Sequence, residues 1–166
     1  MDKYYKLGGW EKLPGEVGRN GIDGLYIKRS NKGKIIDVLI AESKYNKSQL
    51  GNTLCGKQMS KSWILCKIDD LIKKEKDPKQ RKEYQEIRKF IENDVYRAEL
   101  CNLSMENNKI IITKKKIHQK GNTNVKIETI ETKKIDLYDP KNHFEQEIVN
   151  SFKYNLEILP KTVGSL

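Results

Sequence analysis

An acid and a lysine stand at the end of an otherwise apolar stretch of this sequence. Residues 34–45 read KIIDVLIAESKY, so Glu42 and Lys44 follow a run of Val, Leu, Ile and Ala. Side chains alternate along a β-strand, and residues two apart therefore point to the same face. A charged side chain on a buried strand is costly unless a partner or a metal ion neutralises it. The pair is therefore a candidate for a functional site.

Two further polar residues extend this candidate site. Asp23 lies at the start of the preceding apolar run, GIDGLYIKR, and Gln58 follows Glu42 by sixteen residues (58 − 42). A divalent metal that hydrolyses phosphodiesters needs hard oxygen ligands on a rigid element and open positions for phosphate and water. Asp23 and Glu42 suit the ligand role, and Lys44 suits activation of the water or stabilisation of charge on the phosphate. We expect the Gln58 amide to reach the same site from the helix that follows.

Each signal alone is weak, because an E-x-K tripeptide occurs by chance in any charged protein and NGIDG can be a simple turn. The segments GRNGIDGLY, VLIAESKY and GKQMSKSWI together are more specific. As a set they resemble the core of the PD-(D/E)XK, or restriction-endonuclease-like, superfamily. More narrowly, they resemble the nuclease domains of bacterial polymorphic and contact-dependent growth inhibition (CdiA C-terminal) toxins. The resemblance covers residues 18–64.

The resemblance implies an α/β fold with a central mixed β-sheet flanked by α-helices. It also implies that Asp23, Glu42, Lys44 and Gln58 are the catalytic residues. The cofactor that it implies is a divalent metal, Mg²⁺ before Mn²⁺ or Zn²⁺, held by the first two of these residues. Families of this type often add a glutamate from an N-terminal helix. Glu11 and Glu16 are both candidates for that further acid.

The function that the resemblance implies is a metal-dependent endonuclease acting on DNA or RNA, including transfer RNA. A toxin of this kind acts in the cytoplasm of the target bacterium, after delivery from the producing cell if it is part of a secreted protein. It is neutralised by a cognate acidic immunity protein. Two alternatives remain open: a housekeeping or mobile-element endonuclease, and a nucleic-acid-binding module without catalysis. The binding module explains the basic charge but gives no reason for Glu42 and Lys44 on one face of a buried strand.

The composition agrees with a nucleic-acid partner. The 166 residues fit one domain, 1–166, and carry 33 Lys and Arg against 23 Asp and Glu, which gives a formal net charge of +10. Such a balance favours phosphate-bearing partners. The candidate nucleic-acid-binding residues are Lys57, Lys61, Lys114, Lys115 and Lys116. The alternative for the last three is an edge strand that lysines protect from aggregation.

The pattern of apolar residues predicts the elements that position this site. Strands are expected at 22–29 and 34–45, joined by a turn near 31–33. The second of them is apolar on both faces, which predicts a central strand covered by helices. Helical spacing then runs from Leu54 to Ile68 with a break near 51–56. It resumes after Asp77 and Pro78 and continues to Leu100.

The two ends of the chain complete this prediction. Leu7, Trp10 and Leu13 have the spacing of a short N-terminal helix. A C-terminal hairpin is expected from Lys109, turning at KGNTN, and a last helix is expected at 143–159 before Pro160. The lysines of the hairpin and its exposed strand edge make it the predicted docking element for an acidic inhibitor.

The cysteines and the N-terminus exclude several classes. Cys55, Cys66 and Cys101 are odd in number and form no CxxC motif, so we expect buried free thiols and neither a disulfide nor a zinc site. No apolar run reaches the length of a membrane-spanning helix. The N-terminal residues MDKYYKLGGWEKL lack the apolar core of a signal peptide, so we expect no cleaved leader in the chain as it stands.

Overall fold

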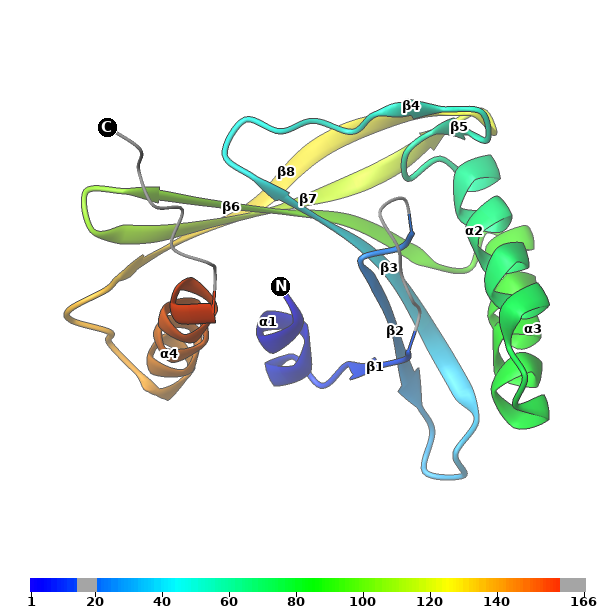
Figure 1. The fold of residues 1–166 in the computed structure, drawn as a ribbon, viewed down its shortest axis with the longest axis horizontal. Helices are drawn as coiled ribbons and strands as arrows, with labels where there is room; N and C mark the ends of the chain where they lie inside the picture. The colour runs from blue at the N-terminus through cyan, green and yellow to red at the C-terminus, as the bar shows by residue number, and fades with distance from the viewer. Residues whose placement is uncertain (15–20, 159–166) are drawn as a thin grey trace.

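The computed structural model describes residues 1–14 and 21–158 and shows an α/β protein (Figure 1). Within these residues, a mixed six-stranded sheet runs in the order β1–β2–β3–β6–β7–β8, and a small hairpin, β4–β5, lies outside it. The helices are α1 (Asp2–Leu7), α2 (Lys61–Lys74), α3 (Pro78–Glu92) and α4 (His143–Ile158). The strands are β1 (Glu11–Lys12), β2 (Gly24–Arg29), β3 (Ile35–Tyr45), β4 (Asn52–Thr53), β5 (Gly56–Lys57), β6 (Arg97–Glu106), β7 (Lys109–Lys120) and β8 (Asn124–Asp136).

The hairpin formed by β2 and β3 confirms the first two predicted strands. The strands pair antiparallel, with Leu25 opposite Ile40 and Ile27 opposite Val38. The turn between them closes at Gly33, whose φ of +78° is accessible to glycine without steric cost. Local sequence signals are therefore sufficient to predict this hairpin.

Strand β3 is central, as its apolar character on both faces predicts. It pairs antiparallel with β2 on one side and parallel with β6 on the other. Val38 and Ile40 belong to one buried cluster, and Leu39 and Ala41 belong to a second one on the opposite face. Burial on both sides is what a continuous run of aliphatic residues requires.

Helices α2 and α3 cover one face of the sheet and begin at clear capping residues. The Ser60 hydroxyl accepts a hydrogen bond from the backbone N–H of Trp63 at the start of α2. Asp77 accepts two backbone N–H bonds at the start of α3, where Pro78 occupies the first turn. The two helices lie side by side in Figure 1 and bury Trp63, Ile68 and Ile87 in the same cluster as Val38 and Ile40. We call the face they cover the α2/α3 face.

Helices α1 and α4 cover the other face. Tyr5 of α1 and Ile148 and Val149 of α4 pack in the cluster that contains Leu39 and Ala41. No helix in the described part of the chain is long and apolar enough to span a membrane.

Three predicted helix limits are wrong. Helix α3 ends at Glu92 and not near Leu100, because the chain turns at Asp94 and enters β6. Residues 98–101 are all buried in the interior of the sheet, and a short fully buried run does not distinguish helix from strand by its spacing. Leu54 is fully exposed in the turn of β4–β5, so α2 begins only at Lys61. Helix α1 stops at Leu7 before two glycines, and Trp10 lies outside it.

The prediction for the cysteines is wrong for two of the three. Cys55 and Cys66 form a disulfide that joins the turn of β4–β5 to α2. Their separation of eleven residues carries no recognisable motif, and only the return of the small hairpin onto the helix brings them together. Cys101 is free and buried, as predicted.

Candidate active site

A pocket of about 470 Å³ lies at the end of β3 and is lined by all four of the predicted catalytic residues, Asp23, Glu42, Lys44 and Gln58. They come from three different segments: the entry to β2, the end of β3 and the turn that precedes α2. The fold therefore brings together residues that span 36 positions of sequence (58 − 23 + 1).

Glu42 and Lys44 lie on the α2/α3 face of β3, as the alternation of strand side chains predicts. The Lys44 Nζ is 3.0 Å from Glu42 Oε1. Glu42 is only 3% exposed, although it stands at the end of the strand. The lysine is thus the cation nearest to a buried carboxylate.

Asp23 is held beside them by the backbone of β3. The N–H of Ser43 donates a hydrogen bond of 2.9 Å to Asp23 Oδ2. This bond links the residue before β2 to the residue that directly follows Glu42. One carboxylate oxygen of Asp23 is engaged in positioning, and the side chain remains exposed to the pocket.

Gln58 reaches Glu42 from a turn and not from a helix, which corrects the sequence expectation. Its Nε2 donates a hydrogen bond of 2.5 Å to Glu42 Oε1. Its own backbone N–H and side-chain oxygen bond to the carbonyl and N–H of Gly51 at 2.8 and 3.3 Å. The turn between β5 and α2 is therefore tied to the chain that leaves β3.

The residue after Gln58 has an unusual backbone conformation. Met59 is fully buried and has a φ of +69°, which is rare for a bulky side chain. Gln119 of β7 bonds to both sides of it: its Nε2 donates to the Met59 carbonyl at 3.0 Å, and its Oε1 accepts from the Lys61 N–H at 2.7 Å. Such conformations persist where the surroundings enforce them, and they are frequent at functional sites.

Sequence reasoning missed Gln119, and the reason is its position. It lies 61 residues after Gln58 (119 − 58) in a polar turn segment, HQKGNTN, without any motif.

Close packing around Gly56 supports the same turn. A Cβ there would come within 2.6 Å of the Ser62 hydroxyl, and the φ of +108° also favours glycine.

One carboxylate oxygen of Glu42 has no partner. Oε1 receives both Gln58 and Lys44, whereas Oε2 is buried without a hydrogen bond from any described residue. The pKa of Glu42 is raised to about 7, mainly by burial and also by the charge of Asp23, against the lowering effects of Lys44 and Gln58. The surroundings therefore do not stabilise the charged form of this carboxylate by themselves.

A divalent cation between Asp23 and Glu42 fits these observations. It would satisfy the buried Oε2 and relieve the repulsion between the two carboxylates. No group of three or more His, Cys, Asp and Glu side chains is arranged for a metal within residues 1–14 and 21–158. Two carboxylates with an amide suit an ion such as Mg²⁺, which keeps several water ligands, better than Zn²⁺, which prefers nitrogen and sulfur.

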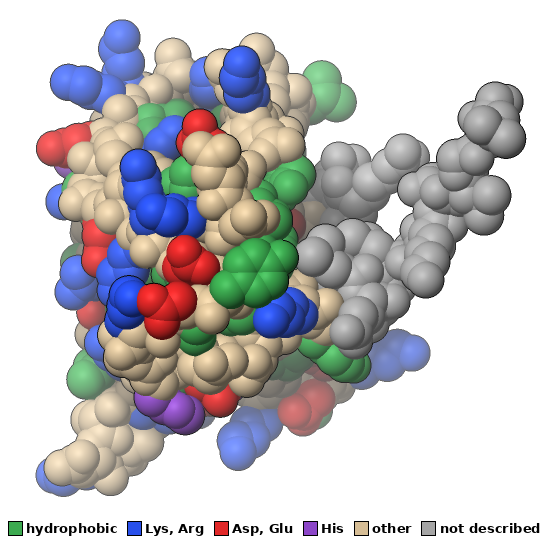
Figure 2. Space-filling view, turned by 90° about the vertical axis from the view of Figure 1, so that its left-hand side faces the viewer, with side chains coloured by type: hydrophobic (Ala, Val, Ile, Leu, Met, Phe, Trp, Pro, Cys, Tyr) green, Lys and Arg blue, Asp and Glu red, His purple; other side chains and the backbone are tan. Residues whose placement is uncertain are grey.

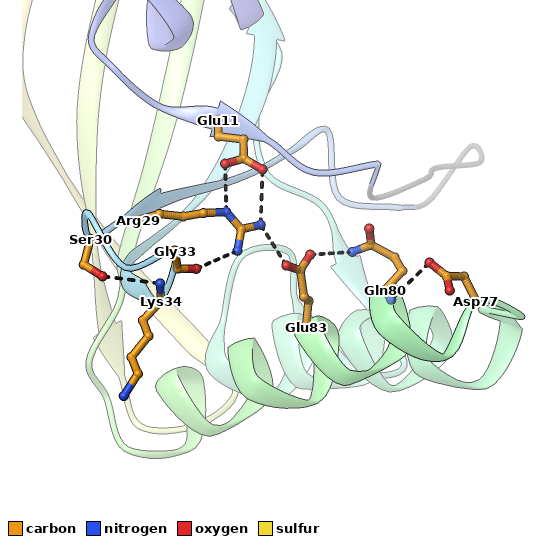
Figure 3. Close-up of polar contacts among 8 residues, drawn as sticks. All are labelled: Glu11, Arg29, Ser30, Gly33, Lys34, Asp77, Gln80 and Glu83. Atoms are coloured by element: carbon orange, nitrogen blue, oxygen red, sulfur yellow. Dashed lines mark hydrogen bonds and ion pairs between the residues drawn. The ribbon is translucent and has the colours of Figure 1, made fainter.

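Glu11, one of the two further candidate acids, has a different partner. Its carboxylate binds Arg29 in β2 at 3.0 and 3.2 Å, and the same guanidinium also bonds to Glu83 of α3 (Figure 3). This network joins β1, β2 and α3, and Glu11 does not line the pocket. Glu16 lies outside the described residues.

The five candidate nucleic-acid-binding lysines fall into two groups. Lys61 pairs with Asp94 at 2.8 Å, and Lys114 pairs with Glu99 at 3.4 Å. The amino groups of Lys57, Lys115 and Lys116 have no carboxylate within salt-bridge distance among the described residues. Figure 2 shows one end of the molecule, where basic and acidic side chains are interspersed and form no purely basic patch. The net positive charge is therefore not concentrated on that face.

Comparison with known proteins found no matching family model, and no significant match among curated proteins or solved structures. The geometry of the pocket is therefore the main guide to function.

Proposed function

We propose that this protein is a metal-dependent endonuclease that hydrolyses phosphodiester bonds of DNA or RNA, with transfer RNA among the candidate substrates. The observation that carries the proposal is the buried, unpartnered Oε2 of Glu42 in a pocket shared with Asp23 and Lys44. A buried carboxylate in this state is costly without a cation. A metal-dependent hydrolytic site accounts both for that cation and for the adjacent lysine.

Each residue has a role in this proposal. Asp23 and Glu42 hold the cation, with Mg²⁺ as the first choice and Mn²⁺ or Zn²⁺ as alternatives. When bound, such an ion polarises a phosphate oxygen and lowers the pKa of a water molecule. Lys44 stabilises the charge that develops on the phosphate or orients the attacking water. Gln58 holds Oε1 of Glu42 and thereby leaves Oε2 for the cation.

The order of elements supports a PD-(D/E)XK, restriction-endonuclease-like core. An acid precedes β2, an E-x-K sequence ends the central strand β3, and α2 follows on the same face. In this proposal the chain is a toxin domain that acts in the cytoplasm of a target bacterium, and a cognate acidic immunity protein neutralises it. The product of the neighbouring gene distinguishes a toxin from a housekeeping endonuclease, because a small acidic protein that binds this chain is expected only for a toxin.

The direct test is cleavage of plasmid DNA and of total RNA with Mg²⁺, Mn²⁺ or Zn²⁺, each repeated with EDTA. We expect breakdown of at least one substrate that requires metal and is lost in Glu42→Gln. The matched control is Glu106→Gln, which alters an exposed glutamate at the far end of β6. A second readout is thermal shift: Mn²⁺ should stabilise the parent protein and the control but not Glu42→Gln. Gel shift without cleavage in every metal would favour a binding module, and full activity in folded Glu42→Gln would exclude this mechanism.

A further inference from the structure

A second groove adjoins the catalytic pocket. It has a volume of about 360 Å³ and is lined by the segment from Ser48 to Lys57 on one side and by β6, β7 and β8 on the other. Gln49 lines both the groove and the catalytic pocket, so the two lie on either side of this residue. Their walls are formed by the same α2/α3 face of the sheet.

The strand register places the groove in line with the catalytic carboxylate. Glu42 of β3 lies opposite Leu100 of β6, Leu100 lies opposite Lys115 of β7, and Lys115 lies opposite Thr129 of β8. Neighbouring strands are about 4.7–4.9 Å apart, so Lys115 stands about 10 Å from Glu42 across the sheet. A polymeric ligand bound at Glu42 can extend along this row of paired residues toward Lys115.

The charge of the groove is positive. Lys57 and Lys115 line it from opposite walls, and no acidic residue is among its lining residues. Neither amino group forms an ion pair with a described carboxylate, in contrast to Lys61 and Lys114. Two unpaired lysines that converge on one hollow provide a site for an anion such as a phosphate.

The remaining lining is suited to a nucleotide. Ile127 is 40% exposed and offers an apolar surface beside Lys115. The Asn102 amide donates to the Asn46 carbonyl at 2.9 Å, which leaves its oxygen as an acceptor, and Thr129 adds a hydroxyl. A volume of about 360 Å³ is near the lower end of ligand pockets, about 300–1,000 Å³, and therefore suits one nucleotide rather than a duplex.

We propose that this groove binds one unpaired nucleotide of a single-stranded nucleic acid, next to the phosphodiester that is cleaved at Asp23 and Glu42. Lys57 and Lys115 hold its phosphate, and Ile127 contacts its base. This inference rests on the proposed nuclease function, which makes the neighbouring pocket the site of cleavage. The binding site itself can be tested without catalysis.

The test compares two double variants with the same loss of charge. Lys57→Ala/Lys115→Ala removes the groove lysines, and Lys120→Ala/Lys126→Ala removes two exposed lysines of the same hairpin whose positions alternate to the other face. Binding of a fluorescein-labelled single-stranded DNA or RNA 12-mer is followed by anisotropy in EDTA over a range of salt concentrations. We expect the groove variant to bind about tenfold more weakly, with a log–log salt slope reduced by about 0.7 for the one single-strand phosphate that the two lysines hold. The control variant should change by less than about twofold because it leaves the groove intact.

A third variant tests the apolar contact. Ile127→Asp introduces a carboxylate into the groove, beside Lys115. Ile130→Asp is the control, because it introduces a carboxylate at another exposed isoleucine of β8 that lies outside the groove. The first should weaken single-strand binding as strongly as the lysine variant, whereas the second should not. Circular dichroism confirms that each variant is folded.

The outcomes separate this inference from the proposed function. Equal weakening by both double variants, or equal loss for a duplex 12-mer, would overturn the nucleotide site. If the parent protein cleaves with Mg²⁺ and the groove variant binds and cleaves like its control, the groove inference fails and the nuclease stands. If no metal supports cleavage but the groove variant alone loses binding, the nuclease fails and the nucleotide site stands.

Discussion

At the scale of single residues, Glu42 makes stability depend on pH. Its pKa is about 7 in the folded protein, above the ordinary value of 4.5, mainly because it is buried. The folded state thus holds this proton more tightly than the unfolded chain, so the contribution of Glu42 to stability is fully present below pH 4.5 and is lost as pH rises through 7. In EDTA at pH 8, Glu42→Gln should therefore be more stable than the parent by up to about 3 kcal/mol.

Urea unfolding at pH 5 and pH 8 measures this difference. It should be several-fold smaller at pH 5, where the folded parent carboxyl is largely protonated. Glu106→Gln, an exposed change, should show no such pH-dependent gain. A Glu42→Gln protein less stable than the parent at pH 8 would contradict the assignment of an uncompensated buried charge.

Lys44 should matter for chemistry and not for metal binding. It is the cation nearest to Glu42, at 3.0 Å, but an ammonium group does not bind a metal ion. We expect Lys44→Ala to lower kcat by about 10²–10³, the cost of losing one group that stabilises transition-state charge. The thermal shift with Mn²⁺ should remain. Lys47→Ala, an exposed lysine in the turn after β3, is the control, and the same loss of kcat there would contradict a specific role.

At the scale of elements, the β7–β8 hairpin supports the active-site turn. Gln119 bonds to the carbonyl of Met59 and the N–H of Lys61, and the tip also accepts backbone bonds from Lys57 and Ser62. Residues 119–124 are therefore fixed against the active-site turn. Deleting them to test partner docking would also disturb the pocket.

Gln119→Glu tests this support with little change in size. The carboxylate can still accept the Lys61 N–H but cannot donate to the Met59 carbonyl, and losing that bond should cost about 1–3 kcal/mol of stability. The metal concentration for half-maximal activity should rise, while kcat at saturating metal stays near that of the parent. Gln85→Glu, on the exposed side of α3, is the control. A fall in kcat at saturating metal would contradict a purely positioning role.

The disulfide joins the same turn to α2. Cys55 and Cys66 enclose Gln58 and Met59 in one short ring, so reduction should lower the free energy of unfolding by about 2–3 kcal/mol. Denaturant titration with and without dithiothreitol measures this loss, and Cys55→Ser/Cys66→Ser should be insensitive to the reductant. Thiol labelling of the unreduced, denatured protein should detect only Cys101. Three reactive thiols before reduction would contradict the bond.

The elements also indicate what sequence alone can predict. Alternation and turn residues correctly gave β2, β3 and the C-terminal hairpin, because these signals are local. The grouping of Glu42 with Lys44 follows from the same strand period. Strand β6 was missed because its buried run resembles a helix face, and its parallel pairing with β3 crosses α2 and α3 and has no local sequence signal. Gln119 and the disulfide were missed because only tertiary packing brings them to the turn.

At the scale of the whole molecule, the positive charge is not gathered into one purely basic patch on the face that Figure 2 shows. The formal net charge is +10, but several lysines form ion pairs, and one end of the protein carries both basic and acidic side chains. An acidic partner would be attracted at long range, with an association rate that falls with salt. Strand β8 is one of the two edge strands of the sheet in the described residues, the other being the two-residue β1, and β8 remains the proposed place for such a partner to add a strand.

The parallel pairing of β3 with β6 has a consequence for the newly made chain. The four proposed catalytic residues have all been synthesised by residue 58, but β3 gains its second neighbour only when β6 follows α2 and α3. A fragment of residues 1–92 should therefore lack metal-dependent cleavage, although it contains Asp23, Glu42, Lys44 and Gln58. Adding residues 93–166 in trans should restore some cleavage if pairing alone is missing, and an active isolated fragment would contradict this dependence. On the ribosome, the chain would thus remain inactive until most of it has emerged.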